Sequence, residues 1–234
     1  MKQFFKIIII ALAILCSFPQ LSDAKVKKTQ RKTKTAEKQY VDLGLPSGTL
    51  WATMNVGANK PEDYGDYFAW GETKPKDNYR WSTYKWYNAS SDKITKYIPK
   101  SNRYGNADNK SELEPTDDAA YVNWGPSWRM PSMEQMRELI SECTWQWTTQ
   151  NGVNGYLVSS KSNSNTLFLP AAGFRFGTII KDTKTDGNYW VRKADPNYPY
   201  VNAFYLNFNS KSIDMDYYFD RSYGRNVRAV RAKK

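Results

Sequence analysis

Residues 124–140 read WGPSWRMPSMEQMRELI, and they contain the clearest helix start in the chain. Pro131 cannot lie inside a helix, Ser132 is a good N-cap, and Gln135 stands three residues later, where it completes a capping box. The helix is therefore predicted to begin at Met133. Apolar side chains then recur at helical spacing, at Met133, Met136, Leu139, Ile140 and Cys143. This periodicity predicts an amphipathic helix that packs on a core.

The first 24 residues have the organisation of a signal peptide. Lys2 and Lys6 precede an apolar run, IIIIALAIL, that is too short to span a bilayer, and a small-x-small cleavage site ends at Ala24. We therefore expect export, with the mature protein in the periplasm, on the cell surface or in the medium. Contact with the membrane is expected only through this cleaved segment. A lipid on Cys16 is the less favoured alternative, because the residues before it are larger than lipoprotein signals use.

Residues 25–38, KVKKTQRKTKTAEK, carry seven Lys or Arg and one Glu with very few apolar side chains. Such a segment cannot bury enough surface to order itself, so it is interpreted as a disordered, basic tether. A basic arm that attracts anionic polymers is the alternative. Because much of the formal net charge of +11 lies here, no specific nucleic-acid binding is expected of the domain that follows.

Cleavage after Ala24 leaves Cys143 as the one cysteine, and the chain has no histidine. An internal disulfide is then excluded, and Cys143 is interpreted as a buried side chain on the helix described above. Without histidine the usual nucleophile–base pairs and zinc sites are absent. The composition therefore predicts a protein that is not an enzyme and uses no cofactor or metal.

Residues 39–234 are predicted to form one α+β domain, with a polar surface insertion around residues 74–115. Asp117 and Asp118 are expected to cap a short helical turn that Gly125 ends. A strand over residues 50–56 is expected to alternate between a face with Leu50 and a face with Trp51. The other strands are expected at residues 67–70, 156–160, 166–169, 203–208, 213–219 and 227–231.

Five segments of this domain resemble one family of exported bacterial domains. They are VDLGLPSGTLWATMNVGA (41–58), YGDYFAWGET (64–73), WGPSWRMPSMEQMREL (124–139), LFLPAAGFR (167–175) and RSYGRNVRAVR (221–231). Together they resemble the Fibrobacter succinogenes major paralogous domain, of the C-type-lectin-like superfamily. The resemblance implies a C-type-lectin-like fold with short antiparallel sheets, two flanking helices and chain ends that pair. It says little about activity, because this fold serves many functions.

The chain lacks the motifs of two activities that are known in this superfamily. Calcium-dependent lectins of this superfamily carry Glu-Pro-Asn or Gln-Pro-Asp with Trp-Asn-Asp, whereas this chain offers Glu114-Pro115-Thr116 and no such triplet. Its formylglycine-generating enzymes need a reactive cysteine pair, which one mature cysteine cannot supply. Neither activity is expected here.

The chain contains 9 Trp and 17 Tyr. The tryptophans of the family segments, Trp51, Trp70, Trp124 and Trp128, are interpreted as framework residues. In residues 189–223, by contrast, Tyr, Asn, Ser and Asp alternate with apolar positions, as in adaptable recognition surfaces. The candidate ligand residues are Trp190, Tyr198, Tyr200, Asn202, Tyr205, Asn207, Asn209, Asp214, Asp216 and Tyr218. An ordinary polar sheet face is the competing interpretation.

We therefore expect an exported, non-enzymatic recognition or adhesion domain whose partner is a glycan or a surface protein. Its C-terminal segment has a composition like that of retroelement-diversified proteins, so diversification of this segment is a further hypothesis. A structural envelope or surface-assembly component is the first alternative function. A polysaccharide-active enzyme is the second.

Overall fold

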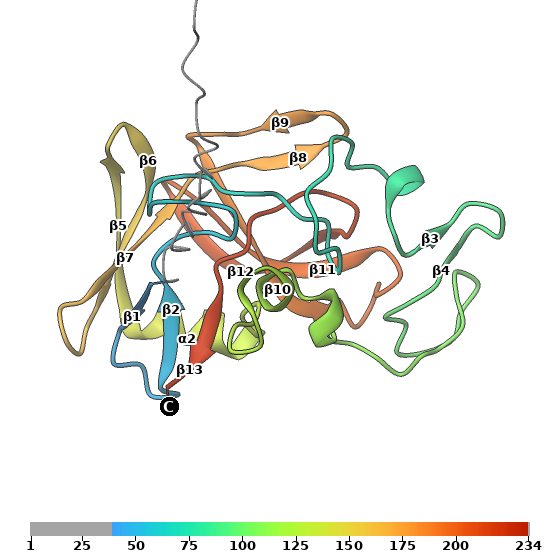
Figure 1. Ribbon diagram of the computed structural model, residues 1–234, viewed down its shortest axis with the longest axis horizontal. Helices are drawn as coiled ribbons and strands as arrows, with labels where there is room; N and C mark the ends of the chain where they lie inside the picture. The colour runs from blue at the N-terminus through green and yellow to red at the C-terminus, as the bar shows by residue number, and fades with distance from the viewer. Residues whose placement is uncertain (1–38, 234) are drawn as a thin grey trace, which may run out of the picture. The chain divides into compact units, whose positions relative to one another are not determined.

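The computed structural model describes residues 39–233, which contain five small antiparallel sheets and two α-helices (Figure 1). The α+β class expected from the sequence is confirmed at this level, with β-structure predominating. The predicted signal peptide, the basic tether and Cys16 lie outside the described residues. Within the described residues no helix is both long and apolar enough to cross a membrane.

The two ends of the domain pair in one sheet. This sheet contains β1 (Tyr40–Asp42), β2 (Thr49–Ala52) and β13 (Val230–Ala232), and Trp51 lies opposite Val230. The predicted strand over residues 50–56 is shorter than expected, because β2 ends at Ala52. All four residues of β2 are buried, because Trp51 packs into one hydrophobic cluster and Ala52 into another.

The predicted helix is α2 (Met133–Glu142), and its capping box is present as expected. The Gln135 amide N–H donates to the Ser132 hydroxyl at 3.1 Å, and the Ser132 amide N–H donates to the Gln135 side chain at 3.0 Å. Cys143 is buried as predicted, but it follows the helix and begins β5 (Cys143–Gln150). The sequence analysis did not predict β5, which pairs with β6 (Val153–Ser160) beside β7 (Thr166–Pro170).

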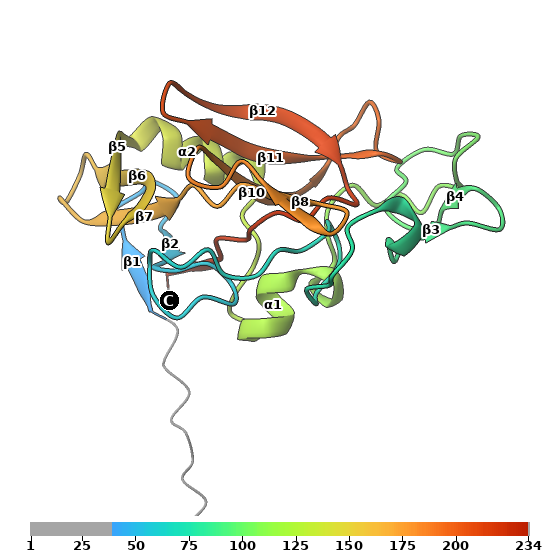
Figure 2. The same ribbon diagram turned by 90° about the horizontal axis from the view of Figure 1, so that it is seen from above.

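The C-terminal sheet contains β10 (Asp186–Ala194), β11 (Asn202–Asn209) and β12 (Ser212–Asp220), in that order. One face packs with α2 around Leu206 and Phe208, whereas Trp190 and Tyr205 belong to a second cluster that includes residues of α1 (Ala119–Trp124). Figure 2 shows β12 along the outer edge of the sheet, and β8 (Phe174–Phe176) and β9 (Ile179–Lys181) form a separate ribbon. Both faces of the sheet are therefore partly covered.

The short helical turn predicted after Asp117 is α1. Asp118 is its N-cap and accepts hydrogen bonds from the amides of Ala120 and Tyr121, while Gly125 ends the helix. Asp118 also accepts from the Met130 amide at 2.8 Å, so one carboxylate joins α1 to the segment that leads into α2. The capping role predicted for Asp118 is confirmed. Asp117 instead lies in a 3-10 turn, Pro115–Asp117, and accepts from Lys96 and Tyr97.

Residues 67–70 form no strand, contrary to the prediction, although all four are buried. Phe68 makes an isolated bridge with Arg225, and each backbone donates one hydrogen bond to the other. Residues 67–70 are extended because the C-terminal motif, residues 221–231, runs beside them. The backbone pairing between Phe68 and Arg225 is too short to form a strand ladder.

The segment from residue 74 to 115, predicted as a polar surface insertion, has many exposed residues but also contains buried ones. It contains a 3-10 turn (Trp81–Thr83) and a ribbon of β3 (Tyr87–Asn88) and β4 (Lys93–Ile94), and Tyr79, Tyr97 and Ile98 within it are fully buried. Tyr79, Tyr84, Ile94 and Ile98 form a hydrophobic cluster with Tyr67 and Ala69. In the sequence, the surrounding Lys, Asn and Ser residues obscure this cluster.

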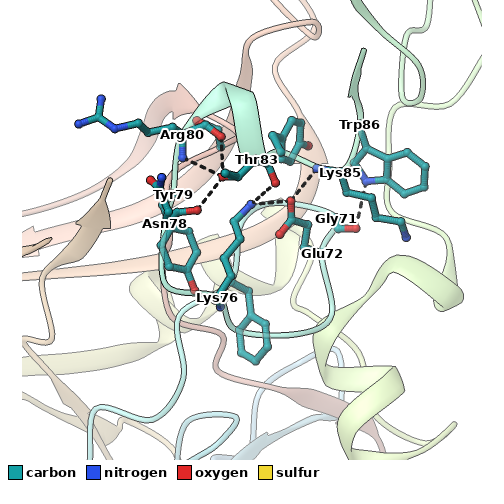
Figure 3. Close-up of polar contacts among 12 residues, drawn as sticks. Gly71, Glu72, Lys76, Asn78, Tyr79, Arg80, Thr83, Lys85 and Trp86 are labelled. Carbon is teal, nitrogen blue, oxygen red and sulfur yellow. Dashed lines mark hydrogen bonds and ion pairs between the residues drawn. The ribbon is translucent and has the colours of Figure 1, made fainter. Parts of the chain in front are cut away.

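A buried carboxylate fixes the start of this segment (Figure 3). Glu72 accepts a hydrogen bond from the Lys76 ammonium at 2.8 Å and from the Lys85 amide at 2.8 Å. The Lys76 ammonium also donates to the Thr83 carbonyl at 2.9 Å, and the Trp86 indole donates to the Gly71 carbonyl at 3.0 Å. These contacts close residues 71–86 into a defined loop.

Two arginines of the C-terminal motif are interior framework residues. Arg221 donates to the Tyr84 hydroxyl and to the carbonyls of Pro199 and Lys96. Arg228 donates to the Asn55 side chain at 2.8 Å and to the carbonyls of Ala52 and Phe168 at 3.1 and 3.0 Å. Both side chains are fully buried. Each guanidinium therefore joins segments that are distant in sequence.

Candidate functional site

The predicted ligand face belongs to the β10–β11–β12 sheet, whose alternation sends successive residues to opposite faces. Phe204, Leu206 and Phe208 contact the cluster that contains α2, as their spacing predicts. Tyr205 and Asn207 fall on the other face. This second face is where a recognition surface would lie, but only part of it is open.

Trp190 and Tyr205 do not fit the role predicted for them. Trp190 is 0% exposed and donates its indole N–H to the Phe68 carbonyl at 2.8 Å. Tyr205 is 5% exposed, and its ring lies 5.7 Å from that of Trp190 in an edge-on arrangement. Both side chains are framework residues, because the segments around α1 cover this half of the face.

Tyr198, Tyr200 and Asn202 lie at one end of β11, seven residues from Asn209 at the other. At about 3.3 Å per residue that separation is roughly 23 Å, so the ten candidates do not form one site. The Tyr200 ring stacks on Tyr104 with centroids 4.3 Å apart. There the two rings border a shallow hollow of about 210 Å³, with Trp81, Tyr87, Asp92, Ile94 and Val201.

The polar candidates at the other end have local structural partners. Asn209 accepts hydrogen bonds from the backbone of the β11–β12 turn, and Asp214 accepts from the Asp216 amide at 2.8 Å. Asp216 also pairs with Arg137 of α2 at 2.8 Å, in an exposed contact. Asn207 remains half-buried on the second face and donates to the Asn188 side chain at 3.2 Å.

An exposed aromatic row on β12 was only partly predicted. Tyr217, Tyr218 and Phe219 are 48%, 44% and 47% exposed, whereas alternation predicts that Tyr217 and Phe219 are buried. A register shift between Tyr205 and Asn207 displaces the pairing of β12, and β12 is an edge strand. Three consecutive aromatic side chains therefore remain in contact with solvent.

Beside this row lies a hollow of about 180 Å³ that the sequence analysis did not predict. It opens on the uncovered part of the second face and is lined by Phe174, Asp182, Asp186, Asn188, Tyr205, Asn207, Phe219, Tyr223 and Arg225. Of these only Tyr205 and Asn207 were candidates. The signal available in the sequence was Arg225, which stands between the two framework arginines of the C-terminal motif.

A larger hollow, about 510 Å³, lies near the β8–β9 ribbon and is lined by residues such as Tyr64, Asp66, Lys76, Arg175 and Ile180. The Lys76 ammonium there already pairs with Glu72. Across residues 39–233, no group of three or more cysteine, aspartate or glutamate side chains is placed to hold a metal ion.

Comparisons of the chain with protein-family models, with curated proteins and with solved structures found no match.

Proposed function

We propose that this chain is an exported, non-enzymatic recognition or adhesion domain that binds a glycan or a surface protein through β12 and the adjoining hollow. We further propose that it has a C-type-lectin-like fold and belongs with the Fibrobacter succinogenes major paralogous domains, as its five sequence segments suggest. Export rests on the N-terminal sequence pattern.

The aromatic row of β12 carries the proposal. Most aromatic side chains of the domain are buried or half-buried, yet Tyr217, Tyr218 and Phe219 are nearly half exposed and consecutive. Aromatic side chains supply large contact areas at small entropic cost, and they dominate the binding energy of many interfaces. Tyr217 and Phe219 lie opposite Tyr205 and Ala203, on the face that carries the hollow, whereas Tyr218 lies opposite Phe204 on the other face. The hollow and the exposed rings of Tyr217 and Phe219 can therefore contact one ligand.

A binding screen against glycans and isolated surface proteins tests the proposal, at about 150 mM salt to screen nonspecific attraction to the basic chain. Replacing Tyr217 and Tyr218 together by Ala should weaken the binding that the screen finds by at least about fivefold, the loss typical of a contributing interface residue. Tyr40→Ala is the matched control, because Tyr40 is 50% exposed and lies on a different sheet. Equal binding by both variants would refute the role of β12.

A surface-assembly component is the second candidate, and the edge position of β12 favours it. An edge strand presents unpaired backbone groups that can pair with another chain. This function predicts concentration-dependent self-association of the purified protein in analytical ultracentrifugation. A monomer at all concentrations would exclude it.

A further inference from the structure

Arg225 differs from the other buried arginines in what its guanidinium contacts. It is 2% exposed, and its Nε and Nη1 have no hydrogen-bond partner among residues 39–233. Arg221 and Arg228, by contrast, each donate from three nitrogens to oxygen acceptors. Unpaired donors at this depth are rare in folded proteins, so each one needs an explanation.

Aromatic rings hold this guanidinium in place. Its central carbon lies 3.9 Å from the centre of the Tyr205 ring and 4.3 Å from that of Trp190, with Phe174, Phe219 and Tyr223 within 6 Å. Such contacts stabilise the cation through the ring faces but occupy none of its N–H groups. Burial lowers the pKa of Arg225 because desolvation disfavours its charged form, and the neighbouring Tyr205 and Asp220 oppose this shift.

Asn188 carries a further unpaired donor, and it lines the hollow of about 180 Å³ beside β12, as Arg225 does. The Asn188 side chain is 2% exposed, and its Nδ2 has no partner among the described residues. Its Oδ1 accepts from Asn207 Nδ2, which fixes the amide so that Nδ2 is the free donor. Arg225 and Asn188 both line the hollow, and between them three donor nitrogens with almost no solvent exposure lack acceptors among the described residues.

Other residues that line the hollow supply hydrogen-bond acceptors and aromatic rings rather than donors. Asp182 and Asp186 contribute carboxylates, which accept hydrogen bonds from hydroxyl groups. Phe174 and Tyr223 stack with rings 12° from parallel and supply a flat apolar wall. A ligand that suits this lining needs an anionic acceptor at one end, hydroxyl groups elsewhere, and a ring that can lie against aromatic side chains.

We propose that this hollow binds one acidic sugar residue of a glycan, with its carboxylate on Arg225 and Asn188 and its hydroxyl groups on Asp182 and Asp186. This inference rests on the recognition function proposed above and names the ligand class. A neutral sugar would offer these unpaired donors no anionic acceptor. A ligand that is anionic on every side would be repelled by the two aspartates.

Titration calorimetry with the purified protein tests the inference. The probes are oligogalacturonate and oligoglucuronate, and their methyl esters are matched neutral controls. The acids should bind and the esters should bind at least about tenfold more weakly, the loss expected when one charge-assisted hydrogen bond disappears. Arg225→Met should cause the same loss. Arg103→Met, at an exposed arginine outside the hollow, should change nothing.

A second measurement does not depend on how well the variant folds. In the wild-type protein, the Arg225 Nε–H resonance should shift on addition of the acidic oligomer and stay unchanged with the ester. The inference is overturned if neither acid binds, if the esters bind equally well, or if this resonance does not respond. Arg225-dependent binding of an oligoglutamate peptide in place of the sugars would overturn the assignment to a glycan. Binding of another ligand that depends on Tyr217 and Tyr218 but not on Arg225 would leave the recognition function standing and remove this inference.

Discussion

Replacing Arg228 or Arg225 by Met should destabilise the domain by very different amounts, although both side chains are buried and both changes remove the same charge. Arg228→Met removes the donors to Asn55 Oδ1, the Ala52 carbonyl and the Phe168 carbonyl. A buried acceptor left unpaired costs about 1–3 kcal/mol. Because removal of a buried cation returns part of its desolvation cost, we take the low end for all three. The expected loss is about 3 kcal/mol.

Arg225→Met removes no hydrogen bond at Nε or Nη1. The methionine thioether can still pack between Trp190 and Tyr205, and the lost cation–π attraction of about 1–2 kcal/mol is offset by relief of the buried charge. The backbone pairing of residue 225 with Phe68 does not involve the side chain. The expected change in stability is within about 1 kcal/mol.

Urea unfolding followed by tryptophan fluorescence measures both variants, with equal m-values as the check that the same transition is compared. For a domain of this size the Arg228 variant should melt about 6–12 °C below the wild type, and the Arg225 variant within a few degrees of it. If both variants lose the same stability, the unpaired nitrogens of Arg225 have partners in solution and the reasoning fails.

Three further predictions concern single groups. Ser132→Ala should cost about 1 kcal/mol, because it removes the N-cap hydrogen bond of α2, whereas Ser141→Ala, at an exposed serine of the same helix, should cost much less in the same urea titration. Burial raises the pKa of the Cys143 thiol to about 11. An aromatic disulfide reagent at pH 8 should therefore react slowly with this thiol in the folded protein and quickly in urea. Rapid reaction of the folded protein would contradict the burial of Cys143. Burial alone would raise the pKa of Asp117, but hydrogen bonds from Lys96, Tyr97 and Lys85 outweigh it and the pKa is lowered. Asp117 therefore stabilises the fold above its unfolded pKa of about 4, and this contribution is lost as the pH falls through its lower folded pKa. Asp117→Asn should make the free energy of unfolding less dependent on acid pH. An unchanged pH profile of stability would refute this prediction.

Local signals in the sequence were sufficient for the parts of the fold that short-range contacts determine. Ser132 and Gln135 cap α2 through hydrogen bonds three residues apart, and Asp118 caps α1 through its own neighbours. The strands β11 and β12 were also predicted, at residues 203–208 and 213–219, because their apolar positions alternate. Such features depend on periodicity and spacing, which a single sequence displays.

Long-range packing decided which side chains are buried or exposed where local sequence patterns predicted otherwise. Residues 74–115 look like a surface insertion by composition, yet Tyr79 and Ile98 pack in a cluster with Tyr67 and Ala69, and Tyr97 packs in the cluster that contains Trp70. Trp190 and Tyr205 lie in a segment whose composition is typical of a recognition surface, but both pack in the hydrophobic cluster that includes residues of α1. Tyr217 and Phe219 alternate as core residues should, but the register shift leaves them exposed.

The C-terminal motif shows this division most clearly. The sequence by itself determined that Arg221, Arg225 and Arg228 occur within eight residues. Only the tertiary structure decided that the first and last meet oxygen acceptors and the middle one meets aromatic rings beside a hollow. The reason is physical: a guanidinium is satisfied or left unpaired by atoms that other segments bring to it, and here those segments lie from about 20 to more than 170 residues away.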